Sequence, residues 1–407
     1  MQIIIHRGSH QIGGMATEIK TDKTRIIIDM GEELSLEDGF KSDPLDIPGV
    51  TDNNGICDAI LLTHYHGDHT KQLNLARSSI PMYAGKLTKE IMLISEKNQL
   101  QRDKKYDSVE KQQETEQRIE RIEKIQAFTQ GNTLKIGDIQ ITPYTVDHSA
   151  IDAYMFLIEA DGKRILYTGD FRLHGFRGKG LPKILRKYIH HCDVLMTEGT
   201  ALNRYENELL EERELQDILK QKYIPNYKYI FILASTTNMD RIFSAANATP
   251  RGKYFICDEY QSSLINEVQI YYSKYSSFYK HIKMTKFGTN LLKRFRKRGF
   301  VMMIRQNEQF EEIIKLFDPK QSIILYSMWD GYLIKKDSKT PDFLNLVDNW
   351  MQWHTSGHAS KKDIKKVIEL ANPSVVIPMH TENPELIKTL LPGRKVIILQ
   401  DKEIYTV

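Results

Sequence analysis

The chain has 407 residues, 41% of them apolar, and its 57 basic residues nearly balance its 53 acidic ones. This length exceeds that of most single domains, so we expect two domains or one large domain with an insertion. The near balance of charge means that any nucleic-acid site must come from a local cluster. No apolar run approaches the roughly 20 residues of a membrane span, and the N-terminus lacks the longer hydrophobic stretch of a signal peptide. With three scattered cysteines, the sequence predicts a cytoplasmic protein without disulfides and without a membrane association.

Short β-branched apolar runs along the chain end in residues that can carry chemistry. The runs are 25–30 with Asp29, 59–63 before a histidine cluster, 139–148 with His148, 164–170 with Asp170, 193–198 with Glu198, and 375–380 with His380. Such runs are too short for helices and are typical of buried strands. Six strands that deliver polar residues at their ends predict a site at the edge of a sheet core.

Residues 86–128 are heavily charged and helical in pattern, with Ile119, Ile122 and Ile125 at three-residue spacing. This pattern predicts a pair of surface helices with a narrow apolar stripe. A lid or a docking surface for a partner is the alternative.

The pattern changes after residue 200. Apolar runs at 229–234, 254–257, 300–304 and 322–326 alternate with helical stretches, which predicts a parallel α/β unit. The earlier pattern, a short β-branched run that ends in a chemically active residue, returns after residue 354. There Ser360 and Asp363 form a capping box before a helix that leads into a strand. We therefore expect a parent domain in two parts, 1–200 and 354–407, with an inserted domain at 201–353.

The segment "THYHGDH" places His64, His66, Asp68 and His69 within six residues. Imidazole and carboxylate ligands favour zinc, or manganese when carboxylates contribute. Two such ions about 3.5–4 Å apart would form a two-metal hydrolytic centre. His148 would complete the first ligand set and Asp170 would bridge both ions. Surface histidines in a turn are the alternative, which the matching downstream His and Asp disfavour.

This cluster, with a strand-end Asp before it and a His and an Asp after it, resembles the metallo-β-lactamase superfamily. The resemblance implies an α/β fold, an αββα sandwich with the site along one edge of its two sheets. It implies that Asp29 orients the site and that one metal is held by His64, His66 and His148. The other metal would be held by Asp68 and His69, with Asp170 between the two.

Further motifs resemble the β-CASP nuclease branch, which includes ribonuclease J and the cleavage and polyadenylation endonucleases. Glu198 in "MTEGT" matches its acidic motif, His358 in "HTSGH" its second motif and His380 in "IPMH" its third. The inserted domain lies between the first two of these, as it does in that branch. A histidine at the third motif resembles the RNA-cleaving members and implies that His380 is a further ligand of the second metal.

The chemistry of phosphodiester hydrolysis gives these residues roles. Two metals lower the pKa of a bridging water and neutralise charge on the phosphate. The departing ribose oxygen needs a proton, and His358 is a candidate donor if Glu198 orients it. The alternative is that His358 binds a phosphate without donating a proton. We count Asp29, Asp68, Glu198 and His358 as candidate catalytic residues.

Two turns offer donors to a phosphate. "LASTTNMDRI" joins a strand to a helix, so Thr236 and Thr237 could cradle a phosphate, or could cap the helix instead. The turn resembles the phosphate-binding turn of ribonuclease J. Ser356 in "HTSGH" is similar to another phosphate contact of that family, and His354 is a weaker candidate.

The tract 271–300 contains no acidic residue, and its cations include Lys293, Arg294, Arg296 and Lys297. Its basic residues alternate with aromatic ones such as Tyr275 and Phe278, as single-stranded RNA binding requires. The alternative is an amphipathic helix with a basic outer face and aromatic residues packed inward.

The sequence thus predicts a metal-dependent ribonuclease with two divalent ions, zinc or manganese, and RNA as its substrate. A small-molecule metallo-hydrolase of the lactonase or glyoxalase type and an inactive RNA-binding protein are the alternatives. Oligomerisation stays open. The chain ends soon after residue 395, so we expect it to lack the extra C-terminal domain of ribonuclease J, which favours a compact processing endonuclease as much as ribonuclease J itself.

Overall fold

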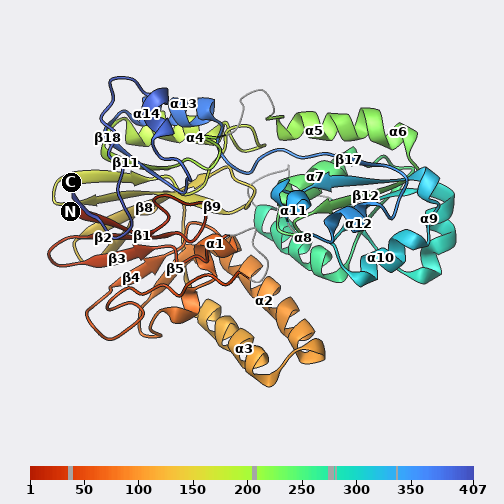
Figure 1. Cartoon of the computed structure of the whole chain (residues 1–407), viewed down its shortest axis with the longest axis horizontal. Helices are drawn as coiled ribbons and strands as arrows, with labels where there is room; N and C mark the ends of the chain where they lie inside the picture. The colour runs from red at the N-terminus through yellow and green to blue at the C-terminus, as the bar shows by residue number, and fades with distance from the viewer. Residues whose placement is uncertain (35–39, 204–208, 274–278, 280–281, 336–337) are drawn as a thin grey trace.

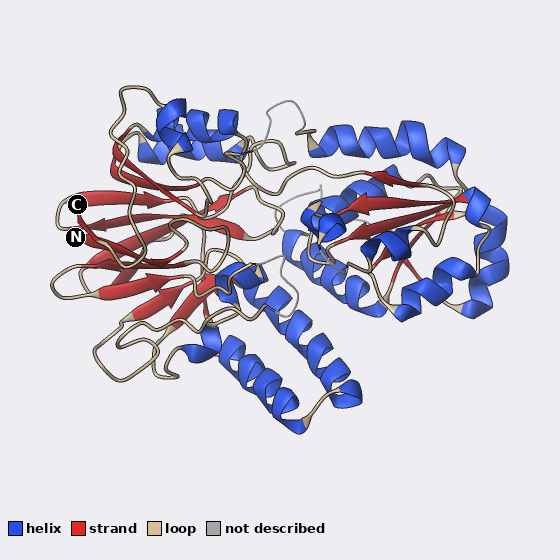
Figure 2. Cartoon of the chain, viewed as in Figure 1, coloured by secondary structure: helices blue, strands red, loops and turns tan. Residues whose placement is uncertain are grey.

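The computed structural model describes residues 1–407 apart from 35–39, 204–208, 274–278, 280, 281, 336 and 337. The described residues form three β-sheets. Two of them pack face to face in one half of the molecule, and the third lies in the other half with helices around it (Figures 1 and 2). None of the helices in the described part of the chain is both long and apolar enough to span a bilayer.

The first sheet has seven strands. In spatial order they are β19 (Ile404–Thr406), β1 (Gln2–Arg7), β2 (Ala16–Lys20), β3 (Arg25–Ile28), β4 (Ala59–Leu61), β5 (Met82–Gly85) and β6 (Gln126–Phe128). β3 and β4 are parallel, with Ile28 opposite Leu61. Asp29 and the histidine motif that begins at His64 therefore leave the sheet at the same edge.

The second sheet has six strands. Their order is β18 (Pro373–Met379), β11 (Cys192–Glu198), β10 (Lys163–Tyr167), β9 (Ala153–Ala160), β8 (Ile139–Val146) and β7 (Leu134–Ile136). β10, β11 and β18 are mutually parallel, so their carboxyl ends meet at one edge. That edge carries Asp170, Glu198 and His380, as the sequence pattern predicts.

The core between the two sheets is built from their inward-facing apolar residues, such as Ile26 and Ile28 from the first sheet and Phe156 and Ile165 from the second. Helices α4 (Gly180–Ile184), α13 (Lys361–Ala371) and α14 (Leu386–Leu390) lie outside the second sheet (Figure 1). The predicted capping box begins α13, because Ser360 and Asp363 bond reciprocally to each other's backbone. Together with helices on the first sheet, these layers confirm the αββα sandwich.

The third sheet is parallel throughout. Its order is β14 (Thr285–Lys286), β13 (Tyr254–Cys257), β15 (Phe300–Ile304), β12 (Tyr229–Ala234), β16 (Ser322–Ser327) and β17 (Trp350–Gln352). The helices around it include α5 (Glu212–Ile218), α6 (Ile224–Asn226), α7 (Met239–Ala248), α8 (Glu259–Tyr272), α9 (Leu292–Arg298), α10 (Glu308–Lys315), α11 (Gly331–Ile334) and α12 (Thr340–Leu344). The alternation predicted for this part of the chain is confirmed.

The charged segment after the histidine motif forms a helical hairpin, α2 (Lys86–Tyr106) and α3 (Val109–Glu123). The prediction of helix as far as residue 128 is wrong, because residues 126–128 form β6 and pair with β5. Ile122 and Ile125 are buried, so the apolar stripe packs inward. α2 also contacts the inserted half, where Ser95 Oγ lies 2.9 Å from Tyr260 Oη of α8.

A buried ionic network joins the two halves of the molecule. Arg172, which follows β10, is fully buried and pairs with Asp147 at 3.2 Å, Glu212 at 3.1 Å and Asp240 at 2.7 Å. Arg241 of α7 is also fully buried and lies 2.9 Å from the same Glu212 carboxylate. Since Glu212 and Asp240 belong to the inserted half, these pairs fix its position against the sandwich.

We predict that Arg172→Ala lowers the free energy of unfolding by about 3–5 kcal/mol, because it leaves buried carboxylates without their cation. The matched control is Lys163→Ala, which removes a partly exposed ion pair with Asp193 and should cost less than about 1 kcal/mol. Urea unfolding monitored by circular dichroism measures both. Equal effects of the two changes would show that the network does not hold the halves together.

Candidate metal centre

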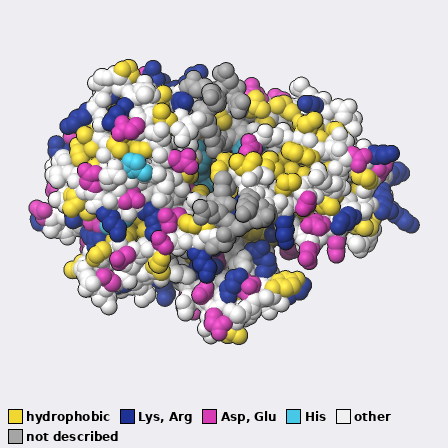
Figure 3. Space-filling model, in the orientation of Figure 1, with side chains coloured by type: hydrophobic (Ala, Val, Ile, Leu, Met, Phe, Trp, Pro, Cys, Tyr) yellow, Lys and Arg dark blue, Asp and Glu magenta, His cyan; other side chains and the backbone are white. Residues whose placement is uncertain are grey.

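The strand ends of the two sheets bring the predicted ligands together. Among the described residues, three groups of side chains have ligand atoms within 4.8 Å of one another, and two of them hold the predicted ligands: His64, His66 and His148 form the first set, and Asp68, His69, Asp170 and His380 form the second. The sets lie beside the inserted half, and histidine side chains are visible in the hollow between the halves (Figure 3). All seven ligands predicted from the sequence therefore converge.

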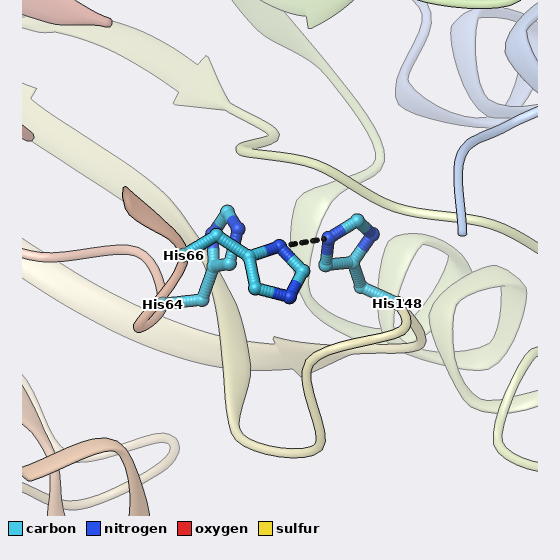
Figure 4. Close-up of side chains that lie close together, drawn as sticks. All are labelled: His64, His66 and His148. Carbon is cyan, nitrogen blue, oxygen red and sulfur yellow. Dashed lines mark hydrogen bonds between the residues drawn. The ribbon is translucent and has the colours of Figure 1, made fainter. Parts of the chain in front are cut away.

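In the first set, the rings of His64, His66 and His148 point toward one another (Figure 4). His148 Nε2 lies 3.2 Å from His66 Nδ1. That spacing is close to the roughly 3.3 Å between two nitrogens bound tetrahedrally to zinc at about 2.0–2.1 Å. His148 Nδ1 donates to the Gly357 carbonyl at 2.6 Å, which leaves Nε2 free of a proton and aimed at the other two rings.

Burial keeps the first set neutral. It lowers the pKa of His66 to about 4 and holds the pKa values of His64 and His148 well below the usual range. An imidazole must be deprotonated to bind a metal. The three rings are therefore ready to act as ligands at neutral pH.

The second set centres on Asp170. Its Oδ2 lies 3.2 Å from His69 Nε2 and 3.9 Å from both His64 Nε2 and His148 Nε2, so this carboxylate stands between the two sets. His380 Nε2 lies 3.2 Å from Asp68 Oδ2.

The charges of the second set attract a cation. Burial opposes the ionisation of Asp68, but the charge of His69 and the contacts with His380 hold the pKa of Asp68 below its usual value. Burial also opposes the charging of His69, yet the carboxylates of Asp170, Asp29 and Asp68 hold the pKa of His69 well above its usual value. A divalent ion bound here would replace the proton that these carboxylates attract.

Polar atoms without partners show that this donor set fits metal ions. Among the described residues, His64 Nε2, His69 Nε2 and Asp170 Oδ2 are buried without a hydrogen-bond partner. Such atoms are rare in native proteins because each one loses its hydration without compensation. Here they face a common space lined by imidazoles and carboxylates, the ligand types that suit zinc and manganese.

Asp29 lies behind the second set. Its carboxylate accepts hydrogen bonds from the Thr63 backbone at 2.8 Å, from Thr63 Oγ1 at 2.7 Å and from His69 Nδ1 at 2.8 Å. Its backbone is left-handed, with φ of 62°. Asp29 thus occupies an orienting position, in which it fixes the His69 ring and the start of the histidine motif.

Gly31 allows the histidine motif to approach this strand closely. A Cβ atom at Gly31 would lie 1.6 Å from the Asp68 carbonyl oxygen. Any side chain at position 31 would therefore displace the backbone that carries Asp68.

Glu198 and His358 form a pair beside the second set. Glu198 is fully buried; its Oε1 accepts from the Phe171 backbone at 2.8 Å and its Oε2 accepts from His358 Nδ1 at 3.0 Å. The His358 side chain is 20% exposed, so a substrate can reach it. The third group consists of Asp170, Glu198, His358 and His380, whose ligand atoms also lie within 4.8 Å of one another. Both Glu198 oxygens already accept hydrogen bonds, which favours its orienting role.

The segment that carries His358 is held by two buried arginines, which donate hydrogen bonds to its backbone carbonyls. Arg241 donates to the carbonyls of Trp353 at 3.1 Å and Thr355 at 3.4 Å, and Arg172 donates to that of Ser356 at 3.0 Å. The Ser356 hydroxyl accepts from the His358 backbone at 3.1 Å. Of the predicted phosphate contacts in this segment, Ser356 is therefore buried within the turn, whereas the neighbouring His354 is partly exposed.

The strand-to-helix turn of the inserted half lies beside the histidine motif. Tyr65 Oη donates to the Thr237 carbonyl at 2.8 Å and accepts from the Ile151 backbone at 3.0 Å. The alternative in which Thr236 or Thr237 caps α7 is wrong, because Asn238 is the N-cap and accepts from the Arg241 backbone.

The four predicted cations of the basic tract lie on α9, far from the metal centre. Lys293, Arg294, Arg296 and Lys297 are exposed on α9, which leads into the start of β15. Because β15 is parallel to β12, α9 lies at the opposite end of the sheet from the turn at Thr237, roughly 15–20 Å away (Figure 1). Phe295 is buried beneath the cations, as in the alternative of an amphipathic helix. Tyr275 and Phe278 lie outside the described residues.

Sequence reasoning missed several supporting residues. Thr200 Oγ1 lies 2.7 Å from His380 Nδ1, and Thr63, Tyr65 and Arg172 make the contacts described above. Thr63, Tyr65 and Thr200 stand next to motif residues, so proximity in the sequence was an available signal. Nothing in the sequence indicated the partners of Arg172.

The chain matches two family models. The Beta-lactamase superfamily domain matches residues 24–220, which hold Asp29, the whole first set, Glu198 and every member of the second set except His380. The chain contains a metallo-β-lactamase superfamily domain. A second model, the Zn-dependent metallo-hydrolase RNA specificity domain, matches residues 352–389, which include the His358 and His380 motifs.

Relatives and a solved structure agree with this assignment. An RNase J-like protein of Methanocaldococcus jannaschii is 29% identical over 51% of this chain and 46% of its own length. Ribonuclease J of Helicobacter pylori strain B128 is 23% identical over 92% of this chain and 55% of its own length. The chain thus spans about half the length of these curated relatives. A crystal structure of an Enterococcus faecalis V583 protein of unknown function, 20% identical, has the same fold, with a TM-score of 0.79 over 100% of this chain and 99% of its own.

We predict that Asp29→Asn weakens the binding of an added divalent metal ion by about 10–100-fold, because a neutral amide no longer anchors the His69 ring. Titration against a chromophoric chelator measures the affinity. Asp22→Asn, an exposed change on the β2–β3 turn, is the control and should leave it unaltered. An Asp29→Asn protein with wild-type affinity would remove the orienting role.

Proposed function

We propose that this chain is a β-CASP ribonuclease that hydrolyses RNA phosphodiester bonds with two divalent metal ions, zinc or manganese. One observation carries the proposal: two donor sets from distant parts of the chain share the buried carboxylate of Asp170. A lone metal-binding histidine cluster would serve many hydrolases. Two adjoining sets suit a phosphate, whose oxygens need charge neutralised on both sides.

The comparisons support RNA as the substrate. The matched RNA specificity domain covers the segment that holds His358 and His380, and the relatives above are named as ribonucleases. The inserted parallel sheet also adds a wall beside the metal centre, which a lactonase-type hydrolase of small molecules does not need. The three cysteines are buried and free, as expected of a cytoplasmic enzyme.

The metal ions and the residues around them would carry out different parts of the hydrolysis. Metal ions in the two sets would lower the pKa of a water molecule and neutralise charge on the phosphate. His358 would give a proton to the departing ribose oxygen. Glu198 holds Nδ1 of that ring, so the proton at Nε2 is the one available for transfer.

The direct test is incubation of end-labelled RNA, 5′-phosphorylated or 5′-triphosphorylated, with zinc or manganese. We predict cleavage by the wild-type chain, and loss of both cleavage and bound metal in Asp68→Ala without unfolding. Asp22→Ala is the control. The product ladder separates exonucleolytic from endonucleolytic action. Bound metal without turnover of any RNA would instead favour the inactive RNA-binding alternative.

A second prediction separates the two roles of His358. His358→Ala should slow RNA cleavage by about 10²–10⁴-fold while metal content stays constant. A p-nitrophenyl ester of a nucleotide has a leaving group that needs no proton, so its hydrolysis should fall far less. An equal loss on both substrates would assign His358 to phosphate binding.

A further inference from the structure

A cavity lies where three segments of the chain meet. Its volume is about 230 Å³, which is below the roughly 300–1,000 Å³ of sites that enclose a whole drug-sized ligand, and it is partly open to solvent, so a ligand can enter it in part. His66 borders it from the metal motif, Met92 and Arg121 from the α2–α3 hairpin, and Thr237 from the inserted half. The cavity therefore adjoins the first metal set and gives the charged hairpin a place beside the site.

The charges around the cavity favour an anion. Lys71, Arg118 and Arg121 line it against a single carboxylate, Glu96. Arg118 is paired with Glu96 at 2.9 Å. Arg121 donates through Nη2 to the Ala76 carbonyl, while its Nε is buried without a partner in the described part of the chain. Lys71 is exposed and forms no ion pair with any described residue, so positive charge remains for a ligand.

The inner wall of the cavity is apolar. Leu73, Ile91, Met92 and Ile122 line it, and all four are buried or nearly so. A nucleotide has both an anionic phosphate and an apolar base. A cationic rim over an apolar wall therefore matches a nucleotide. The phosphate meets the cations while the flat face of the base packs on aliphatic and thioether groups.

We propose that this cavity is an RNA subsite, which holds a nucleotide that flanks the scissile phosphate on the His66 side. The inference rests on the proposed ribonuclease activity. His66 faces the first metal set and also borders the cavity, so a chain that crosses the metals can continue into it. The hairpin is then the outer wall of the RNA path, and Lys71 and Arg121 contact the backbone.

The test compares two double variants that remove equal charge. The cavity variant combines Lys71→Met with Arg121→Met and removes two cations from the rim of the cavity. Lys97→Met with Lys104→Met removes two exposed lysines from the same hairpin, which pair only with Glu123 and Glu116 among the described residues. The probe is a single-stranded oligoribonucleotide with cleavage-resistant phosphorothioate linkages, and its affinity for the metal-loaded chain is measured at several salt concentrations.

We expect the cavity variant to bind about tenfold more weakly. The slope of log affinity against log salt should become shallower by about 1.4, since each single-strand phosphate contact contributes about 0.7. The control should match the wild-type chain. Affinity and slope equal to those of the wild type in the cavity variant would overturn the subsite.

A second pair of variants covers the case in which the loss of Arg121 disturbs folding. Asn74 lines the cavity on a short surface turn, and Asn74→Glu adds a carboxylate there while Asn74→Gln does not. Weakened binding in the Glu variant alone supports the subsite, and equal binding in both overturns it. Because the probe is not cleaved, these results are independent of the ribonuclease proposal, which fails only if the wild-type chain does not cut natural RNA.

Discussion

The buried carboxylate of Asp170 is the interaction on which the rest of the site depends. Its Oδ2 lies within 3.2–3.9 Å of nitrogens on His64, His69, His148 and His358, without a hydrogen bond to any described residue. A buried anion is costly unless positive charge compensates it, so the fold favours cations in this space beside the carboxylates of Asp170 and Asp68. The neutral imidazoles of the first set cannot supply it, and divalent ions can.

Three histidines of that space are fixed from behind by groups that lie outside the two donor sets. Asp29 holds His69, the Gly357 carbonyl holds His148 and Thr200 holds His380. Such partners set the ring orientation and the tautomer of a metal-binding histidine. The buried Arg172 network extends this support, because it fixes the backbone segment that carries Gly357 against both halves of the molecule. Placement of the inserted domain is thereby coupled to the geometry of the metal centre.

The sequence predicted the parts of this arrangement that are local. Short β-branched runs that end in Asp, Glu or His mark strand ends, and parallel pairing brings strand ends together. The contacts that it missed join residues far apart in the chain: His148 meets Gly357, and Thr200 meets His380. No local pattern encodes such contacts. The three-residue strand β6 was read as helix because its neighbours are strongly helical, and tertiary pairing with β5 decides its structure.

The sequence did not indicate where in the fold its charged residues would lie. The cations of α9 stand out in the sequence because no acidic residue interrupts them, yet the topology of the parallel sheet carries them to the end remote from the metals. The cations beside the metal motif are Lys71, Arg118 and Arg121. They are separated in the sequence and come together only through the packing of the hairpin. Cations that are adjacent in the sequence therefore need not lie at the binding site, and cations that are separated in the sequence can meet there in the fold.

Anomalous X-ray diffraction from crystals of the intact chain grown with zinc would locate bound metal ions directly. We expect two peaks about 3.5–4 Å apart, one against His64, His66 and His148 and the other against Asp68, His69 and His380, with Asp170 beside both. A single peak, or peaks away from Asp170, would show that Asp170 does not join two metal sites.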